Sequence, residues 1–326
     1  MPISLDDVET LLALYKISYR IRHVELEIAR QYTMGEMRCP VHLSIGQEMP
    51  SALLHLFFSE SDYVVSTHRA HAHYIAKGGN IPAMLAEIFG KVTGCSKGRG
   101  GSMHLSDPTV NFMGSSAIVG NSIPIGVGIA YGIKIRNEST RSFVFIGDGA
   151  TEEGVFYESI NFAVLHNLPV TFVCENNFYS VYSRLDHRQP RNRRIYQLVQ
   201  AMGMRSSYLP FGDLQYSFSQ LNEILTTNNM GPSFIEIETY RWLEHCGPHN
   251  DDDLDYRDSQ EREIYLNYDI LEDLKARIAK VNIEAIDLLK SVEREIHFEA
   301  REAFAFARNS PFPNLMEARG DFYEFK

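Results

Sequence analysis

The feature that most constrains the fold of this chain is an apolar run that ends on an aspartate between two glycines. The run SFVFI, residues 142–146, is rich in β-forming side chains and is followed at once by Gly-Asp-Gly. A helix-like stretch, 152–166, comes next, and a second apolar run, 168–175, ends at two asparagines. Short apolar runs separated by a helix are typical of parallel strands in a right-handed β–α–β unit. The pattern predicts an α/β fold with a parallel central sheet, flanked by helices on both faces.

Other segments extend this prediction. The apolar run 233–240 predicts a further strand. Apolar residues at helical spacing predict an N-terminal helix over about 4–32, with Ser4 as its cap and acidic residues in the first turn. A charged C-terminal region, about 259–308, is also predicted to be helical. The glycine-rich segment 94–105 is predicted to be irregular.

Two polar side chains follow consecutive predicted strands. Asp148 comes directly after the first strand, and Asn177 follows the second, 29 residues later. Ligands of an open parallel sheet bind beyond the carboxyl ends of its strands, where these side chains can converge. Carboxylate and amide oxygens suit Mg²⁺ or Ca²⁺, and Mg²⁺ commonly completes its shell with phosphate oxygens and water. The glycines allow close approach, and the following helix N-terminus favours an anion. The sequence thus predicts a divalent cation that bridges the protein to a diphosphate.

The net charge, the cysteines and the N-terminal sequence indicate which partners and which cellular location to expect. A net charge of −11 argues against nucleic acid or an anionic membrane surface as partner. The four cysteines form no C-x-x-C pair, which favours reduced thiols in a cytosolic protein. The first residues carry acid and no basic region, unlike a targeting peptide, and no apolar run reaches the ~18 residues of a membrane span. We therefore expect a cytoplasmic protein that binds neither nucleic acid nor membrane.

A Gly-Asp-Gly turn alone is common, so it becomes a specific signal for a cofactor site only in combination with the asparagine pair. That combination resembles the thiamine-diphosphate motif. From about residue 46 to 257 the chain resembles the α subunit of a heterotetrameric 2-oxo acid dehydrogenase E1 component, of the pyruvate, branched-chain or acetoin type. The resemblance rests on HLSIGQE, STHRAHAH, GCSKGRGGSMH, AIVGNSIPIGVGIA, GDGATEEGVFYESINFA, PVTFVCENNFYSV and TYRW-x-x-HCGP.

The resemblance implies a thiamine-diphosphate-binding fold, with residues 1–326 as a single domain that holds the Mg–diphosphate half of the cofactor. It implies that the side chains of Asp148 and Asn177 and the backbone carbonyl of Tyr179 bind Mg²⁺. The backbones of Gly149 and Ala150 would contact the diphosphate.

The resemblance also implies contacts from two other segments. Arg69 would grip the diphosphate, since a planar guanidinium suits phosphate oxygens. His68, another implied cofactor contact, stands where pyruvate dehydrogenases carry a tyrosine. Ala117, at a position usually held by glycine, and Val119 would approach the aminopyrimidine ring with their backbones. Ile118 and Val119 would help to bend the cofactor.

Histidines supply the implied catalytic groups. His71 and His245 match the active-site histidines of the family, and His245 would also contact the cofactor. Imidazoles of this kind would stabilise developing charge and move protons near neutral pH. For His73, a packing role and a functional role are equally open. Cys246 stands where mammalian relatives carry a phosphorylated serine, so that regulation is not expected. The acidic loop 249–257 is expected to be solvated.

The implied function is decarboxylation of a 2-oxo acid, or cleavage of acetoin, with acyl transfer to the lipoyl group of an acyltransferase. In relatives the β subunit supplies the glutamate that thiamine catalysis needs, so we expect an α₂β₂ heterotetramer and an inactive isolated chain. One alternative is a two-component thiamine enzyme that transfers an acyl or ketol unit to a carbonyl acceptor without lipoyl. Another is a non-catalytic paralogue, which the intact Asp148, Asn177 and Arg69 disfavour.

Overall fold

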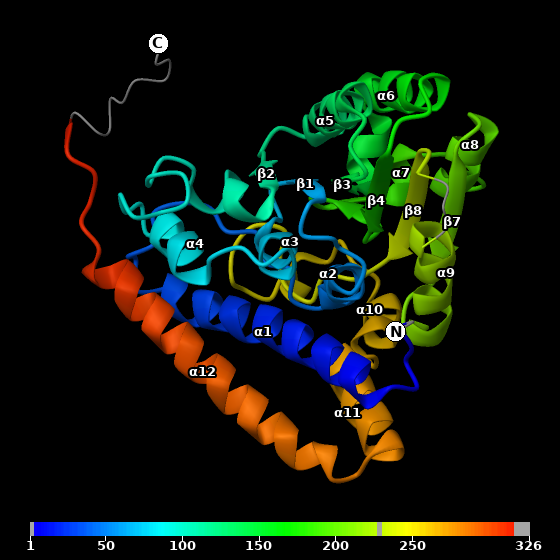
Figure 1. Ribbon diagram of the computed structural model, residues 1–326. Helices are drawn as coiled ribbons and strands as arrows, with labels where there is room; N and C mark the ends of the chain where they lie inside the picture. The colour runs from blue at the N-terminus through cyan, green and yellow to red at the C-terminus, as the bar shows by residue number, and fades with distance from the viewer. Residues whose placement is uncertain (1–2, 227–229, 316–326) are drawn as a thin grey trace.

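A parallel six-stranded sheet lies at the centre of the computed structural model, which describes residues 3–226 and 230–315 (Figure 1). All its strand pairs are parallel, as predicted. The predicted runs form β3, β4 and β8, and shorter strands complete both edges. The order across the sheet is β2 (Phe112–Ser115), β1 (Tyr63–Ser66), β3 (Ser142–Gly147), β4 (Val170–Asn176), β8 (Ser233–Glu238) and β7 (Arg205–Leu209).

Helices cover both faces of the sheet, as predicted, because alternate residues of each strand point to opposite sides. On β3, Val144 and Ile146 pack on one face, and Phe143 and Phe145 pack on the other. The first face is covered by α5 (Ser122–Arg136), α6 (Gly154–Leu165) and α8 (Ile195–Ala201). The second is covered by α2 (Glu48–His55), α3 (His71–Ala76) and α9 (Leu214–Thr226).

The N-terminal helix α1 (Val8–Tyr32) begins later than predicted. Its cap is Asp7, whose carboxylate accepts a hydrogen bond from the backbone N–H of Thr10 at 3.0 Å. The prediction of Ser4 as the cap is wrong, because the Ser4 hydroxyl instead accepts from the N–H of Asp6. A carboxylate three residues before a free helix N–H is the better cap here.

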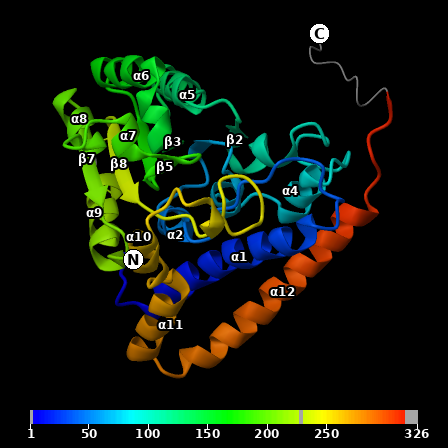
Figure 2. The same cartoon turned by 180° about the vertical axis from the view of Figure 1, so that it is seen from behind.

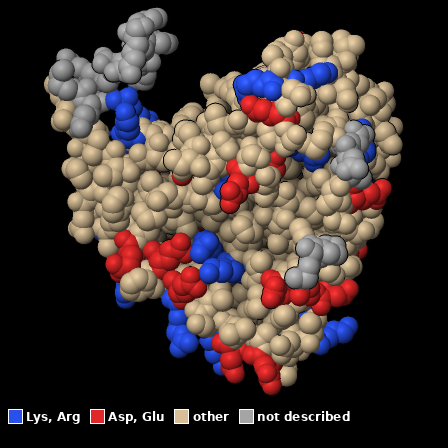
Figure 3. Space-filling view, viewed as in Figure 1, with Lys and Arg blue, Asp and Glu red and all other residues tan. Residues whose placement is uncertain are grey.

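The C-terminal region is helical, as predicted, and forms three helices. They are α10 (Ser259–Leu266), α11 (Ile270–Val281) and α12 (Ala285–Asn309). Figures 1 and 2 both show α12 running beside α1 at the edge of the molecule, where it also packs on α4 (Ile81–Ile88). Acidic and basic side chains mix along this lower edge in Figure 3, and ion pairs such as Lys16–Glu295 and Arg20–Glu299 join α1 to α12. Within the described ranges, no helix has the length and apolarity needed to cross a membrane.

The glycine-rich loop after α4 wraps around a carboxylate of the protein itself. Glu87 accepts hydrogen bonds from the backbone N–H groups of Ser96, Gly98, Gly100 and Gly101, at 2.6 to 3.2 Å. A Cβ added at Gly94 would lie 2.2 Å from a carboxylate oxygen of Glu87. The glycines therefore allow the loop to pack closely around the buried carboxyl group of Glu87.

Candidate functional site

A cavity lies at the carboxyl edge of the sheet, beyond β1, β3 and β4. The segments that follow these three strands form most of its wall, and the loop before α5 forms another part. Its lining residues are Gln47, Thr67, His68, Arg69, Ser116, Ile118, Val119, Gly120, Ser122, Gly147, Asp148, Gly149, Ala150, Glu175, Asn177, Tyr179, Ser180 and His245. The structure thus brings Asp148 and Asn177 to one cavity, as their positions after adjacent strands predict.

Asp148 opens a 3₁₀ turn, Asp148–Glu152, directly after β3. Its side chain is buried, and its Oδ2 atom accepts a hydrogen bond from Nη2 of Arg188 at 2.5 Å. Burial raises the pKa of the Asp148 carboxyl, and the guanidinium of Arg188 offsets part of this rise. Arg188 also pairs with Glu152. Sequence reasoning missed Arg188, because nothing local to its arginine-rich segment connects it to Asp148.

Asn177 and Tyr179 lie on a turn of unusual backbone conformation after β4. Phe178 between them has φ +66°, and Val181 has φ +55°, in the left-handed region that non-glycine residues rarely adopt. The Asn177 side chain donates to Oε1 of Gln47 at 2.9 Å and accepts from the N–H of Tyr179 at 3.2 Å. Such strain concentrates at functional sites, and here it directs both residues to the cavity.

Arg69 is a buried cation on the cavity wall. It donates to the backbone carbonyls of Leu43 at 2.5 Å and His245 at 3.0 Å. Among the described residues it forms no ion pair with a carboxylate, and burial lowers its pKa to about 9. A buried charge is costly without a partner of opposite sign. The side of Arg69 that faces the cavity is therefore suited to an anion.

Gln47 provides a buried N–H donor without a hydrogen-bond partner among the described residues. Its Oε1 atom accepts from Asn177 and from Thr239, which fixes the orientation of the amide. Its Nε2 atom is buried and has no hydrogen-bond partner among the described residues. A buried N–H without a partner costs free energy until a ligand or water accepts from it. Together, Asp148, Asn177, Arg69 and Gln47 form a donor set that fits an anion accompanied by a hard cation.

All of the other predicted cofactor contacts except Ala117 line the cavity. Gly149, Ala150, Tyr179, His68 and His245 line the cavity. The loop before α5 brings Ile118 and Val119 to its mouth, where both side chains are exposed. Ala117 lies on the same loop but is not among the lining residues.

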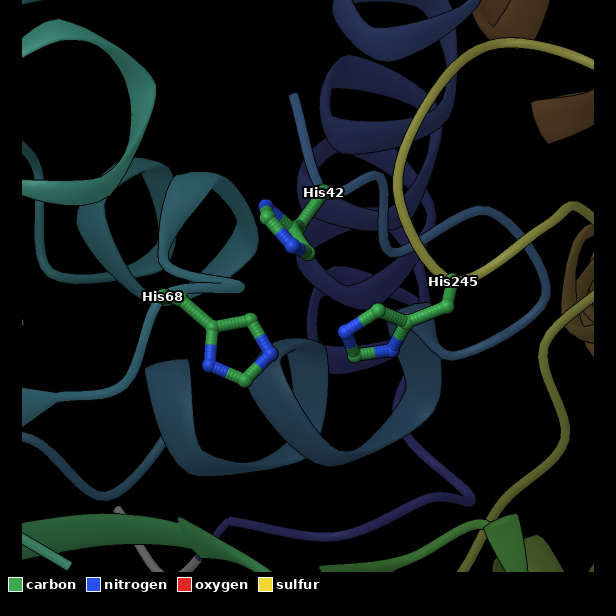
Figure 4. Close-up of side chains that lie close together, drawn as sticks. All are labelled: His42, His68 and His245. Carbon is green, nitrogen blue, oxygen red and sulfur yellow. The ribbon is translucent and has the colours of Figure 1, made fainter. Parts of the chain in front are cut away.

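Three histidines, His42, His68 and His245, lie close together (Figure 4), and two of them, His68 and His245, line the cavity. The ring centroids of His42 and His68 are 4.6 Å apart, and His245 lies 5.0 Å from His42 and 5.4 Å from His68. Burial, with a further contribution from Arg69, lowers the pKa of His42 to about 2, of His68 to about 4 and of His245 to about 3. All three imidazoles are therefore neutral near pH 7. Sequence reasoning missed His42, and its place in HLSIGQE was the only available signal.

His71 does not join this cluster. It is fully buried, its Nδ1 atom lies 3.2 Å from Glu25, and its Nε2 atom lies 2.8 Å from the hydroxyl of Ser102. It is not among the residues that line the cavity. The structure thus separates His71 from His245, and a direct catalytic role for His71 stays a prediction that this geometry does not favour.

His73 has more than packing contacts. Its ring stacks on Phe145 at a centroid distance of 3.7 Å. Its Nδ1 atom lies 2.7 Å from the hydroxyl of Ser66, and its Nε2 atom lies 3.0 Å from Oε1 of Glu175. Because Glu175 lines the cavity, His73 orients a carboxylate of the site wall.

The expectation of a solvated acidic loop is wrong for Asp251 and Arg257, whose side chains are buried. Asp251 is buried, pairs with Arg257 at 3.0 Å and accepts from the hydroxyl of Tyr256. Arg241 is buried beside them and donates to the carbonyls of Leu243 and Val181. Two buried arginines need a nearby negative charge, which Asp251 supplies. This network fixes the segment that carries His245.

Comparison with known proteins adds independent information. A family model described as "Dehydrogenase E1 component" matches residues 17–316. The chain is 34% identical to a pyruvate dehydrogenase E1 component subunit alpha of Rickettsia bellii, over 97% of this chain and 96% of that protein. It is 34% identical to the subunit of the same name from Porphyra purpurea, over 95% and 91%. A chloroplastic alpha-3 subunit of Arabidopsis thaliana is also 34% identical, over 93% of this chain and 72% of the relative.

Proposed function

This chain belongs to the thiamine-diphosphate-dependent dehydrogenase E1 component family, as an α-type member, and we propose that it holds the Mg–diphosphate end of the cofactor. On this proposal residues 1–326 act as one cofactor-binding domain. A pyruvate-like 2-oxo acid is decarboxylated and its acyl group passed to lipoyl, together with a β subunit. The curated relatives are named as pyruvate dehydrogenase subunits, which supports a small 2-oxo acid as substrate. A cytoplasmic location stays a prediction.

The observation that carries the proposal is that Asp148 and Asn177 lie at one cavity with a buried Arg69 that forms no ion pair with any described carboxylate. Asp148 and Asn177 would hold Mg²⁺ with the backbone carbonyl of Tyr179, since all three are hard oxygen donors. Arg69 would supply the countercharge to the diphosphate, and this role is supported because its buried charge has no carboxylate partner in the part of the chain that the structure describes. The residues present therefore fit the group.

Bound thiamine diphosphate would supply the nucleophilic carbon and electron sink for decarboxylation. The protein's own residues would position the cofactor and the substrate within the cavity. Gly149 and Ala150 lie at the turn where a diphosphate can approach the backbone, and Ile118 and Val119 stand at the mouth of the cavity. His68 and His245 are neutral, so each can donate one hydrogen bond and accept another at the substrate end.

A β subunit would complete the site. Helix α5 supports this proposal, because it exposes Ile125, Tyr131 and Ile135, and a Cβ added at Gly128 would meet open space. Phe162 and Leu165 of the neighbouring α6 are also exposed. An apolar surface beside the cavity is typical of a protein–protein interface.

One observation favours the second candidate, transfer of an acyl or ketol unit to a carbonyl acceptor without lipoyl. Two neutral imidazoles, His68 and His245, line the cavity close together, where they can hydrogen-bond the hydroxyl and carbonyl groups of a polar acceptor. The two candidates differ only in the acceptor. They share the cofactor and the need for a partner chain.

The test is co-expression with a β subunit, followed by measurement of CO₂ release from a panel of 2-oxo acids. The complex should require thiamine diphosphate and Mg²⁺, and Asp148→Ala should abolish the activity while Asp253→Ala, at an exposed acid, should not. Product analysis with a lipoyl domain or an aldehyde as acceptor separates the two candidates. Activity of this chain without any β chain would contradict the proposal.

A further inference from the structure

The side chain of Arg188 ties two parts of the cavity wall together. Arg188 ends the short helix α7 (Leu185–Arg188), which follows the hairpin of β5 (Tyr179–Ser180) and β6 (Ser183–Arg184). One end of its guanidinium pairs with Asp148 at 2.5 Å and with Glu152, and its Nε atom donates to the carbonyl of Ser183 at 3.0 Å. Only 12% of the side chain is exposed.

The guanidinium lies against the turn that a diphosphate would approach. A Cβ added at Gly149 would lie 2.8 Å from the hydroxyl oxygen of Ser180 and 3.6 Å from Nη1 of Arg188. Ser180 and Gly149 both line the cavity. The missing side chain at Gly149 therefore lets the Ser180 hydroxyl come close to the backbone of this turn, with the Arg188 guanidinium at van der Waals distance beside it.

The two arginines of this region differ in their partners. Arg69 has backbone carbonyls but no carboxylate among the described residues, whereas Arg188 has two carboxylates. A divalent cation at Asp148 would have to share that buried carboxylate with Arg188, and two cations on one carboxylate repel each other. A diphosphate that arrives with the cation would bring enough negative charge to pair with the guanidinium.

We propose that Arg188 makes the site selective for metal and diphosphate bound together. It competes with a lone divalent cation for Asp148, and it becomes a second diphosphate-binding arginine, beside Arg69, when both ligands are present. The diphosphate half of this inference rests on the proposed function, whereas the competition half rests only on the Arg188–Asp148 pair.

The direction in which loss of Arg188 changes the affinity for a lone cation and the affinity for the diphosphate separates this role from simple structural support. If Arg188 only held the loop in place, its loss would weaken every ligand. If Arg188 competes with a lone cation and binds the diphosphate, its loss strengthens one affinity and weakens the other. Both affinities can be measured without catalysis.

The experiment uses the full chain as wild type, Arg188→Gln, Arg188→Lys and Arg191→Gln. Arg191 is a matched control on the same segment, because 84% of its side chain is exposed and its contact with Asp186 is 4.0 Å long. Mn²⁺ binding alone is measured by electron paramagnetic resonance, and thiamine diphosphate binding at saturating Mg²⁺ by calorimetry. Thermal unfolding checks that each variant is folded.

For Arg188→Gln we expect Mn²⁺ alone to bind at least about threefold more tightly and thiamine diphosphate at least about tenfold more weakly, as for loss of a charge-assisted hydrogen bond. Arg188→Lys keeps the positive charge but loses the planar guanidinium that donates two parallel hydrogen bonds. It should therefore bind Mn²⁺ with wild-type affinity and thiamine diphosphate with an affinity between those of Arg188→Gln and wild type. Arg191→Gln should match the wild type in both.

Weakening of both ligands in Arg188→Gln, or a change in neither, would overturn the inference. If Arg188→Gln does not fold, an Arg188→Lys variant that matches the wild type for thiamine diphosphate would overturn it as well. A wild-type chain that binds no thiamine diphosphate would instead reject the proposed function and the diphosphate half. The Mn²⁺ affinities of wild type and Arg188→Gln would then still show whether Arg188 competes with a lone cation for Asp148.

Discussion

The guanidinium of Arg69 donates a hydrogen bond to the backbone carbonyl of His245 at 3.0 Å, across 176 residues of sequence. This contact joins the segment after β1 to the loop that is fixed by Asp251 and Arg257. The residue proposed to bind the diphosphate therefore also positions the loop that carries His245, which lines the cavity. Changes at Arg69 should affect both ends of the cavity.

We expect Arg69→Gln to weaken thiamine diphosphate binding by about 10- to 100-fold, because a charge-assisted contact to phosphate is lost. Thermal unfolding with and without the cofactor and Mg²⁺ measures this, since a ligand stabilises only a protein that binds it. The control is Arg301→Gln, at a side chain that is 70% exposed. An equal cofactor-induced rise in melting temperature for Arg69→Gln and wild type would contradict the assignment.

The histidine cluster predicts a specific loss of stability in acid. The pKa of His68 is lowered to about 4 in the folded protein, below the ordinary value of 6.5. Between these values the unfolded chain binds a proton that the folded protein does not, so stability is present above pH 6.5 and falls as pH falls toward 4. His68→Gln should reduce the slope by up to about 1.4 kcal/mol per pH unit. Urea unfolding at pH 4.5 to 7.5 measures this, and identical slopes would show that His68 is not held neutral.

Glu87 should be essential for the order of the glycine-rich loop. A glutamine there keeps one acceptor oxygen but turns its NH₂ group toward backbone N–H donors. We expect Glu87→Gln to lower the free energy of unfolding by about 2–4 kcal/mol, since several buried N–H groups lose their acceptor. Urea unfolding measures the change, with Glu302→Gln at an exposed position as control. A free energy of unfolding within experimental error of wild type would show that the hydrogen bonds from the loop N–H groups to Glu87 do not stabilise the protein.

Asp251 should control the loop that carries His245. Asp251→Ala leaves Arg257 without its carboxylate partner in a buried setting, which is strongly destabilising for the contacts around it. We expect faster amide hydrogen exchange over residues 241–257, with little change in the sheet. Asp253→Ala, at an exposed position of the same run, is the control. Equal exchange in the two variants would show that the acidic run is solvated throughout.

The central strands and the convergence of Asp148 and Asn177 on one cavity could be predicted because their signals are local. The apolar runs of β3 and β4 are each followed directly by Asp148 or Asn177, and parallel strand order places both ends at one edge. The short strands β1 and β2 span four residues each, which is too little for a clear periodic pattern. They could be identified only from their pairing in the sheet.

The missed residues reach the site through contacts that are distant in sequence. Arg188 lies 40 residues from Asp148, and Gln47 lies 130 residues from Asn177. His42 joins His68 and His245 only because three separate loops meet there. No composition or spacing rule connects such positions, whereas the resemblance to the family pointed to Arg69, His68 and His245, all of which line the cavity.

The most direct test of the central claim is a calorimetric titration of thiamine diphosphate, at saturating Mg²⁺, into wild type, Asp148→Ala and Asp253→Ala. The account predicts that wild type and Asp253→Ala bind with equal affinity. It also predicts that Asp148→Ala binds at least about 100-fold more weakly, since a metal-ligand carboxylate is lost. Unchanged affinity in Asp148→Ala would contradict the claim that this carboxylate, at the carboxyl end of β3, holds the metal and diphosphate end of the cofactor.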